Sequence, residues 1–402
     1  MIDQRQETDS PTQSVMPIQS FDSIVIGSGT SAYYCINALN KGGQAVAVVD
    51  EREFGGTCAL RGCQPKKYLV ANAEALALAS HLAGIGLSEP PKTDWSALQR
   101  LKNEFLDGIP EGAVTELNEA GIKTFTGKAK LLGPNEVEVG GQRLKAGHIV
   151  LATGAVPRRS DFPGTETTQD SEYFLNMPSL PARILFIGGG YISFEFAHVA
   201  AWAGAKATIL HRSAHPLKAF EQDMVKVILE ASAANGISVV VNETPIRIEP
   251  VDDHFLVHGK TGGQYQADLV IEATGRVPNL TALAGDQAQV DHSPQGVAVN
   301  EYLQSVSNPQ VYAIGDCAAT RYMLAPVADE EGKTAAHNIL HGNSRKVDYS
   351  VVPSTVFTIP NLATVGLTEI QAHAQGIDFR VNKGTTTGWP SSKRIGEKHS
   401  GY

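Results

Sequence analysis

The chain has few cysteines, no run of basic residues and no apolar core of a secretory signal near its start. Four cysteines in 402 residues are too few for a disulfide-stabilised scaffold. Lys and Arg number 33 against 42 Asp and Glu, a net charge of −9, and an acidic chain of this kind is a poor partner for nucleic acid or an anionic membrane. Residues 1–20 are polar and predict a disordered tail. We therefore expect a cytoplasmic protein.

A dinucleotide-binding pattern follows this tail. A β-branched strand at 21–26 leads into Gly27-x-Gly29-x-x-Ala32, which opens a helix, and the next strand ends in Asp50. In such a unit the first glycine makes the turn, the second lets the backbone approach a diphosphate, and the helix N-terminus favours its negative charge. A carboxylate at the end of the second strand can accept hydrogen bonds from ribose hydroxyls. The alternative is a plain glycine-rich turn beside a solvated aspartate.

The pattern recurs further along the chain. A strand at 183–187 enters Gly188-x-Gly190-x-x-Ser193, and a helix and a second strand at 207–210 follow. This is the longest apolar stretch of the sequence, but it holds charged residues and three consecutive glycines. It therefore predicts a strand, turn, helix and strand rather than a membrane span. Two further segments, at 149–157 and 270–278, resemble each other. Each has a predicted strand followed by Ala-Thr-Gly and ends in a proline. They suggest that one nucleotide domain is inserted into the other.

The residues after the second unit indicate which nicotinamide cofactor it binds. Its second strand is followed by His211 and Arg212 rather than by an acid, and Lys218 lies a little further on. An acid would bind a ribose 2′-hydroxyl and repel a 2′-phosphate, whereas two cations favour the phosphate. We predict NADPH over NADH. The alternative is that both cations are ordinary surface charges.

The sequence GGTCALRGCQPKK at 55–67 is the most specific motif. On a regular helix, residues spaced like Cys58 and Cys63 have Cα atoms about 8–9 Å apart, whereas a disulfide needs roughly 4.4–6.8 Å. A bond between them therefore requires distorted backbone, which Gly62 can supply. The motif ends in two lysines that can favour a thiolate. A close pair in a cysteine-poor chain indicates redox chemistry, and the segment has no histidine or third cysteine to complete a metal site. Cys35 and Cys317 are expected to be inert.

Together these motifs resemble the pyridine nucleotide–disulfide oxidoreductases, which include glutathione reductase, dihydrolipoamide dehydrogenase and mercuric reductase. The resemblance covers residues 21–402 and implies an α/β fold with two Rossmann-like dinucleotide-binding domains, one inserted in the other, and an incomplete α+β dimerisation domain. Further matching stretches are ATG at 152–154, GGGYISFEFA at 188–197, ATGRVPN at 273–279, AIGD at 313–316, LAPVA at 324–328 and FTIPNLATVGLTE at 357–369. The expected boundaries are 21–157 with 279–350 for the FAD-binding domain, 158–278 for the NAD(P)H-binding domain and 351–402 for the dimerisation domain.

The resemblance implies roles at the matching positions. Cys58 resembles the thiol that attacks substrate, and Cys63 resembles the thiol stacked against the flavin. Lys66 and Glu195 resemble an ion pair beside flavin N5, and Tyr191 resembles an aromatic lid over the nicotinamide pocket. The residues that would hold FAD are Gly27, Ser28, Gly29, Thr30, Ser31, Ala32, Asp50, Gly56, Thr57, Lys67, Ala129, Thr153, Gly154, Gly315, Asp316 and Ala325. The residues that would contact NADPH are Gly188, Gly189, Gly190, Ile192, Ser193, Arg212, Lys218 and Gly275.

The sequence departs from the family's pattern after residue 351. The family's acid–base histidine lies in a His-Pro motif near the C-terminus and is donated by the partner subunit, whereas His215-Pro216 in this sequence belongs to the NADPH-side loop. We therefore expect either a fragment of a longer chain or a degenerate member of the family. A homodimer is expected for the complete chain, and slow turnover of disulfides is expected for the chain as it stands.

The activity implied by the resemblance is transfer of hydride from NADPH through FAD to the Cys58–Cys63 disulfide and on to a small-molecule disulfide. A glutathione-type disulfide is the first expectation because of the NADPH pattern. A dihydrolipoamide dehydrogenase-like or mercuric reductase-like enzyme is the second, although the C-terminal cysteine pair usual in the latter is not in this sequence. An alternative of another class is a fragment that binds FAD and NADPH without disulfide turnover.

Overall fold

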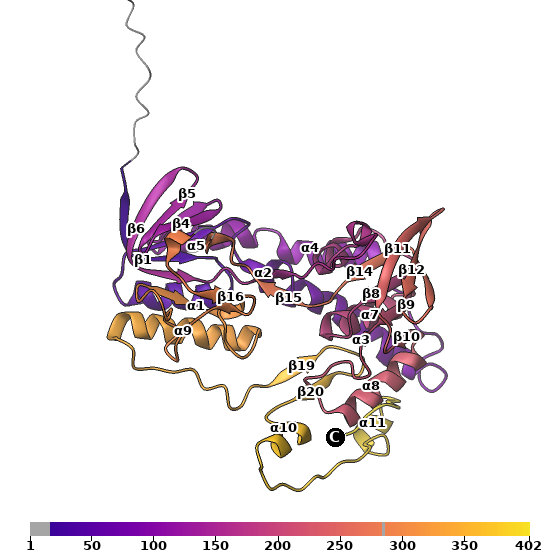
Figure 1. Cartoon of the computed structure of the whole chain (residues 1–402). Helices are drawn as coiled ribbons and strands as arrows, with labels where there is room; N and C mark the ends of the chain where they lie inside the picture. The colour runs from indigo at the N-terminus through magenta and orange to yellow at the C-terminus, as the bar shows by residue number, and fades with distance from the viewer. Residues whose placement is uncertain (1–16, 284–285) are drawn as a thin grey trace, which may run out of the picture.

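The structure is a computed structural model that describes residues 17–283 and 286–402 (Figure 1). Most of the tail predicted over residues 1–20 lies outside the described residues. The predicted boundary at residue 20 is wrong. Gln19 and Ser20 already belong to strand β1 (Gln19–Ile26), because they pair in register with Leu144 and Lys145 of β6 (Gln142–Leu151). Strand β1 therefore begins two residues before the apolar run that predicted it at 21–26.

The first dinucleotide pattern lies at the centre of a seven-stranded sheet. The strands β3, β2, β1 and β6 are parallel neighbours, and β4 and β5 extend the sheet in antiparallel fashion. The chain leaves this sheet after β6 and returns with β18, which pairs with β6. The remaining strands of this sheet are β2 (Val46–Asp50), β3 (Lys123–Thr126), β4 (Ala129–Gly133), β5 (Glu136–Val139) and β18 (Val311–Ala313).

A second, four-stranded parallel sheet holds the second dinucleotide pattern between β6 and β18 in the chain. Its order is β10-β9-β8-β14, and helix α7 (Tyr191–Trp202) connects β8 to β9. A three-stranded antiparallel meander, β11 to β13, is attached to it. The strands are β8 (Arg183–Ile187), β9 (Lys206–Leu210), β10 (Ile237–Val240), β11 (Pro245–Val251), β12 (His254–Gly259), β13 (Gln264–Ala267) and β14 (Leu269–Glu272).

The two sheets are joined by a two-stranded crossover. β7 (Ala155–Pro157) pairs antiparallel with β15 (Arg276–Pro278), and each follows one of the two Ala-Thr-Gly stretches. The predicted fold class, two Rossmann-like units with one inserted in the other, is confirmed by this topology. The exact domain boundaries stay a prediction.

Helices cover both sheets and carry the redox motif. α1 (Thr30–Lys41) packs closely on α9 (Ala325–His341): a Cβ atom at Gly332 would come within 2.2 Å of the Ser31 carbonyl oxygen. None of the helices in the described part of the chain is long and apolar enough to cross a membrane. The other helices are α2 (Gly56–Leu60), α3 (Cys63–His81), α4 (Trp95–Leu106), α5 (Ile109–Glu119), α6 (Ser171–Asn176) and α8 (Gln222–Ala234).

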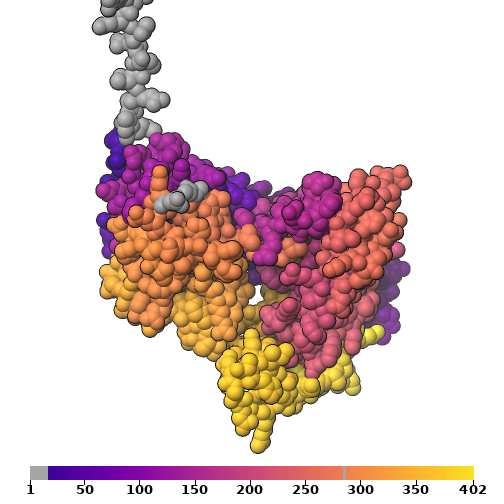
Figure 2. Space-filling view, viewed as in Figure 1, coloured from indigo at the N-terminus to yellow at the C-terminus, as the bar shows by residue number. Residues whose placement is uncertain are grey.

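The C-terminal residues form a lobe of their own, drawn in yellow in Figure 2. It contains β19 (Ser354–Val356), β20 (Leu362–Thr364), α10 (Glu369–Ala374) and α11 (Pro390–Lys393). The side chains of Val356, Ile359 and Leu362 belong to the same buried cluster as α7 and the second sheet. Ile359 also donates its backbone N–H to Nδ1 of the fully buried His198, at 3.2 Å. Residues 356–362 are thus fixed against α7.

Candidate active site

The redox motif forms a break between two helices. α2 ends at Leu60 and α3 begins at Cys63, so the two cysteines lie on different helices, as the predicted distortion at Gly62 requires. A Cβ atom at Gly62 would come within 3.0 Å of the Thr57 carbonyl oxygen. Both cysteines are free thiols and partly exposed. The loop can therefore be reached from outside, and a side chain at its turn would press on the Thr57 carbonyl.

The two thiols differ in their electrostatic surroundings. The Cys58 thiol donates a hydrogen bond to Cys63, and this bond, with the charges of Lys66 and Lys67, lowers the pKa of Cys63 against the effect of burial. The same bond and burial raise the pKa of Cys58. Cys63 is therefore the thiolate of the pair, and Cys58 keeps its proton.

A buried ion pair lies next to the thiols. Lys66 Nζ on α3 is 2.8 Å from Glu195 Oε1 on α7, and their side chains are only 12% and 3% exposed. The same Glu195 oxygen accepts a hydrogen bond from the backbone N–H of Phe357 at 2.9 Å. Lys66 Nζ also lies 4.0 Å from the centroid of the Phe357 ring. Burial raises the pKa of Glu195, while Lys66 opposes that rise. The pairing predicted for these residues is present, and the Phe357 contact was missed.

One cleft of about 320 Å³ gathers most of the predicted site residues. It runs from the first glycine turn along the redox motif to the start of α7. Of the predicted catalytic and FAD-binding residues, the cleft is lined by Gly27, Ser28, Gly29, Thr30, Ser31, Asp50, Gly56, Thr57, Cys58, Cys63, Lys66, Ala129, Thr153, Gly154, Tyr191, Glu195, Gly315, Asp316 and Ala325. Two predicted FAD residues do not line it: Ala32 is fully buried, and Lys67 is exposed beside the Phe357 ring.

The glycines of the first turn are required by close backbone approach. Gly27 has φ 112°, and a Cβ atom there would lie 2.2 Å from the Ala152 carbonyl oxygen. Gly56 has φ 70°, and its Cβ would lie 2.3 Å from Gly29 Cα. The result is a floor without side chains at the N-terminus of α1, which suits a diphosphate. Asp50 Oδ2 accepts hydrogen bonds from Ser28 N at 2.8 Å and Ser28 Oγ at 2.6 Å, which holds this carboxylate at the cleft wall.

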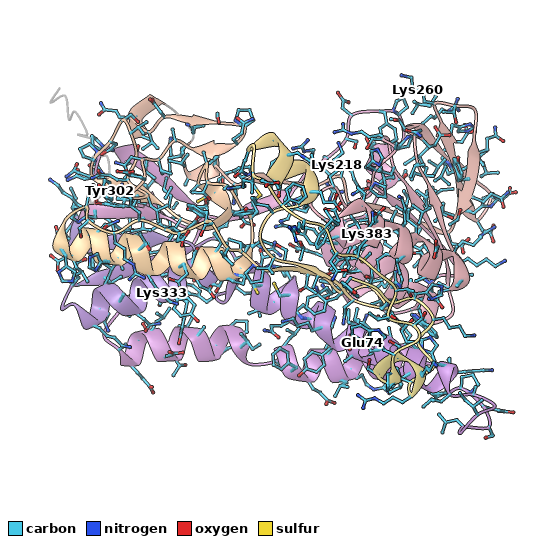
Figure 3. All side chains as sticks on the ribbon, turned by 90° about the horizontal axis from the view of Figure 1, so that it is seen from below. Glu74, Lys218, Lys260, Tyr302, Lys333 and Lys383 are labelled. Atoms are coloured by element: carbon cyan, nitrogen blue, oxygen red, sulfur yellow. The ribbon has the colours of Figure 1, made fainter. Side chains whose placement is uncertain are left out.

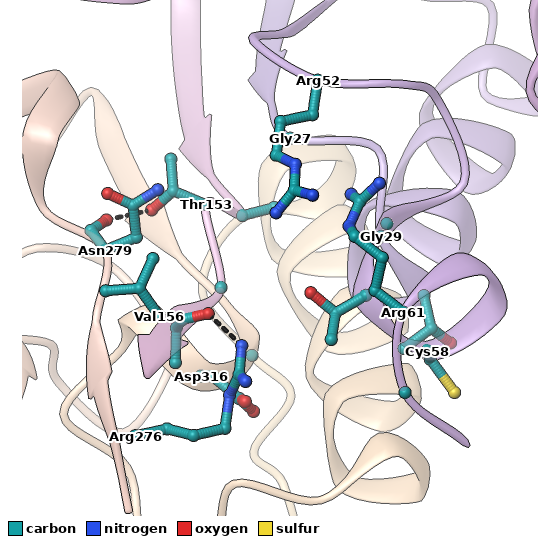
Figure 4. Close-up of a pocket in the computed structure, with 18 of the residues that line it drawn as sticks. Gly27, Gly29, Arg52, Cys58, Arg61, Thr153, Val156, Arg276, Asn279 and Asp316 are labelled. Atoms are coloured by element: carbon teal, nitrogen blue, oxygen red, sulfur yellow. Dashed lines mark hydrogen bonds between the residues drawn. The ribbon is translucent and has the colours of Figure 1, made fainter. Parts of the chain in front are cut away.

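Three arginines in the cleft were missed by the sequence analysis. Arg52 and Arg61 point their guanidinium groups toward one another beside Gly27 and Gly29 (Figure 4). Their carboxylate partners are Glu172, which Arg52 meets with two hydrogen bonds, and Glu53, 2.9 Å from Arg61. Arg61 is only 10% exposed, and its Nε has no partner among the described residues. Both guanidinium groups line the cleft, where they could contact an anionic group in addition to their own carboxylate partners. The position of Arg61 between the two cysteines was the one feature of the sequence that could have indicated its place in the cleft.

The third arginine lies at the other end of the cleft. Arg276 hydrogen-bonds to the Ala155 carbonyl and lies beside Asp316 (Figure 4). Burial raises the pKa of Asp316, and the charge of Arg276 opposes this rise. The predicted FAD ligand Asp316 is thus held near a cation that sequence spacing did not reveal.

The second glycine turn repeats the geometry of the first. Gly188 has φ 118°, and a Cβ atom there would lie 2.3 Å from the Ala273 carbonyl oxygen. Tyr191 opens α7 and is 47% exposed, and it lines the cleft together with Ile192. The other predicted NADPH residues do not line the cleft: Gly188, Gly189, Gly190, Ser193, Arg212, Lys218 and Gly275.

The two predicted phosphate-binding cations lie in the loop after β9. Arg212 and Lys218 are exposed, and neither makes an ion pair within the described residues. His211 stabilises the loop from within, since its Nε2 is 2.8 Å from Ser213 Oγ and 3.2 Å from the His215 carbonyl oxygen. His215 belongs to the His-Pro pair of this sequence, which lies in this loop and not near the C-terminus. It does not line the cleft. Both cations are therefore free to meet an anionic ligand.

Cys58 also lines a second pocket, of about 320 Å³. This pocket shares Ser28, Gly29 and Thr30 with the cleft, and the rest of its wall comes from α1, α5 and the redox motif. Cys63 does not line it. No group of three or more metal-binding side chains was found among the residues that the structure describes.

This fold and site define a flavin- and nicotinamide-dependent oxidoreductase with a dithiol centre. The chain belongs to the pyridine nucleotide–disulphide oxidoreductase family, whose model matches residues 21–332, and the family's dimerisation domain matches residues 352–400. It is therefore an FAD-dependent enzyme that acts on sulfur groups, and the second match supports a homodimer.

Individual relatives have several names. The chain is 32% identical over 375 residues to a dihydrolipoyl dehydrogenase of Chlamydia muridarum, covering 91% of this chain and 80% of the relative. It is 33% identical over 355 residues to a glutathione reductase of Burkholderia cepacia, covering 88% and 78%. Among solved structures, the HOCl-induced flavoprotein disulfide reductase RclA from Escherichia coli matches with a TM-score of 0.84 at 26% identity, covering 94% of this chain and 85% of that one.

The cleft fits the diphosphate of FAD, and its arginines give a prediction. Replacing Arg61 by leucine removes one charge-assisted contact, worth about 1.5–3 kcal/mol. The dissociation constant of FAD should rise roughly 10- to 150-fold, measured by fluorescence titration of the apoprotein. Arg143→Leu is the control, because Arg143 pairs with Glu136 outside the cleft. Equal affinities in the two variants would remove Arg61 from the FAD site.

Proposed function

We propose that this chain passes reducing equivalents from NADPH through FAD to the Cys58–Cys63 pair, and from Cys58 to a small-molecule disulfide. The observation that carries this proposal is the position of the two thiols. Both line the cleft with the predicted FAD residues, but Cys58 alone also lines the second pocket. One thiol can therefore meet a substrate on a different side from the cofactor.

The chain's own residues would hold FAD along the cleft. The Gly27–Gly29 turn, Arg52 and Arg61 would bind its diphosphate, and the Lys66–Glu195 pair lies next to the thiols at the other end. When bound, FAD accepts hydride from NADPH and supplies two electrons to the disulfide. Tyr191, which lines the cleft and is exposed, would cover the nicotinamide site.

The thiol steps follow from the electrostatics of the pair. Two electrons and one proton convert the Cys58–Cys63 disulfide into a Cys58 thiol and a Cys63 thiolate, the state that the hydrogen bond and the lysines favour. Cys58 loses its proton as it attacks one sulfur of the substrate, and the first product takes up that proton and leaves as a thiol. Cys63 attacks the mixed disulfide at Cys58, which reforms the internal disulfide and releases the second product as a thiolate.

NADPH rather than NADH is the nucleotide that Arg212 and Lys218 favour. Arg212→Glu should weaken NADPH by about 1.5–3 kcal/mol, or roughly 10- to 150-fold, with a much smaller effect on NADH. The measurement is the rate of flavin reduction against the concentration of each nucleotide. Lys260→Glu is the matched control, since Lys260 lies on the meander, away from Lys218 (Figure 3). Equal use of NADH and NADPH by the unmodified chain would refute the assignment.

Anaerobic stopped-flow spectroscopy tests the whole proposal. NADPH should bleach the flavin, and a disulfide added afterwards should restore its colour. Reduction of the flavin without reoxidation by any disulfide would favour the alternative of a chain that binds FAD and NADPH without disulfide turnover. Glutathione-type, lipoamide-type and mercuric substrates all stay predictions, and the second pocket bears on the choice between them.

A further inference from the structure

We infer that the second pocket selects small disulfides without carboxylate groups and prefers amine-bearing ones. This rests on the proposed function, because it concerns the substrate of Cys58. The pocket wall is mostly apolar and aromatic. It includes Tyr33, Tyr34 and Ile36 of α1, Phe54 before the redox motif, and Leu117 of α5.

The ionisable groups of this wall are few and of one sign. Apart from Cys58 and the two tyrosines, Glu116 is the ionisable side chain that lines the pocket, and no Lys, Arg or His of the described residues does so. Glu116 lies on the exposed surface of α5. A substrate seated against Cys58 therefore meets a carboxylate and aromatic rings, with no cation in the wall to bind a negative group.

One cation beyond the wall is already paired. Lys333 of α9 lies over the Tyr34 ring, 4.7 Å from its centroid, and its Nζ is 2.6 Å from Glu330 Oε1. A second acid, Asp329, accepts a hydrogen bond from Thr30 of the pocket wall. Its negative charge acts to raise the pKa of Cys58, whereas the positive charge of Lys67, which does not line the pocket, acts to lower it. The preference for charge in this pocket therefore rests on Glu116, the charged side chain that lines its wall.

This arrangement disfavours a substrate of the glutathione type. Oxidised glutathione carries more carboxylates than amines, and each carboxylate brought against Glu116 would lose water without gaining a counter-ion. An amine in the same place gains an ion pair, and an uncharged amide or hydroxyl substituent is tolerated. The substrate class that fits is a small disulfide with amine or uncharged substituents on short aliphatic chains.

The test uses three disulfides of similar size and different charge. The full chain, reduced anaerobically by NADPH, is mixed with cystamine, bis(2-hydroxyethyl) disulfide or dithiodiglycolate, and the rate of flavin reoxidation is measured. Glu116→Lys is compared with Glu119→Lys, a change of the same charge on the same helix but outside the pocket. The two variants are compared on the same disulfide each time, so differences in intrinsic reactivity between the disulfides cancel.

Glu116→Lys should slow cystamine and speed dithiodiglycolate, each by about three- to tenfold at low salt, with bis(2-hydroxyethyl) disulfide unchanged. The effect should shrink as salt is raised. Reoxidation by all three disulfides with no difference between the Glu116 and Glu119 variants would overturn the inference and leave the proposed function standing. Failure of every disulfide to reoxidise the NADPH-reduced chain would overturn both.

Discussion

Replacing Cys58 with serine is expected to abolish disulfide reduction, a loss of roughly a thousandfold or more for a nucleophile. The flavin should still be reduced by NADPH, because the residues predicted to bind both cofactors remain. Cys63 should stay a thiolate, because the serine hydroxyl can donate the hydrogen bond that Cys58 gave, and Lys66 and Lys67 act in the same direction. A thiolate next to oxidised flavin should give a long-wavelength absorbance band at neutral pH.

Cys63→Ser is the matched variant. It should also lose disulfide turnover but show no such band, because the pKa of Cys58 is raised by its burial and its neutral thiol does not donate charge to the flavin. The two absorption spectra, recorded on oxidised protein at neutral pH, distinguish the roles of the thiols. Identical spectra would mean that the assignment of interchange thiol and flavin-side thiol is wrong.

Removing Lys66 should cause the largest loss of stability. Lys66→Met leaves Glu195 charged and 3% exposed, with the Phe357 N–H as its remaining close partner, and breaking a buried pair in this way costs about 3–5 kcal/mol. The loss should grow with pH. Burial raises the pKa of Glu195 above its ordinary value of 4.5. As pH rises above that value, the carboxyl loses its proton in the unfolded state before it does so in the folded state, and the folded state is therefore destabilised.

The measurement is the urea midpoint of each protein at about pH 5 and pH 8 in excess FAD. Lys67→Met is the control, since Lys67 is exposed and makes no ion pair within the described residues. The double variant Lys66→Met with Glu195→Gln should recover part of the loss because no buried charge remains. A midpoint of Lys66→Met that is independent of pH would show that Glu195 is not the group responsible.

The parts of the fold that follow local rules could be predicted from the sequence. Glycine at 27 and 188 is dictated by the approach of the Ala152 and Ala273 carbonyls, and each glycine sits where a strand meets a helix. The break at Gly62 followed from the spacing of the cysteines alone. The insertion of one sheet in the other was indicated by the paired Ala-Thr-Gly stretches, which lead into β7 and β15.

The parts that depend on distant segments could not be predicted. Arg52 follows β2 and Arg61 follows α2, and nothing local shows that their guanidinium groups converge. The Phe357 N–H that binds Glu195 is a backbone group with no sequence signature, and it reaches α7 because residues 356–362 pack there. The charge of the second pocket likewise comes from Glu116, the acidic residue of α5 that lines it. The sequence does not show which side of α5 faces α1.

The central claim is that NADPH delivers its electrons to Cys58 and Cys63, and alkylation of thiols before and after NADPH tests it most directly. Cys35 and Cys317 are fully buried and should stay unmodified in the folded protein. Air-oxidised protein, treated anaerobically with iodoacetamide and analysed by peptide mass spectrometry, should carry label at neither Cys58 nor Cys63. After NADPH, both Cys58 and Cys63, which are partly exposed, should carry label. Labelling of the two cysteines that does not change when NADPH is added would contradict the account.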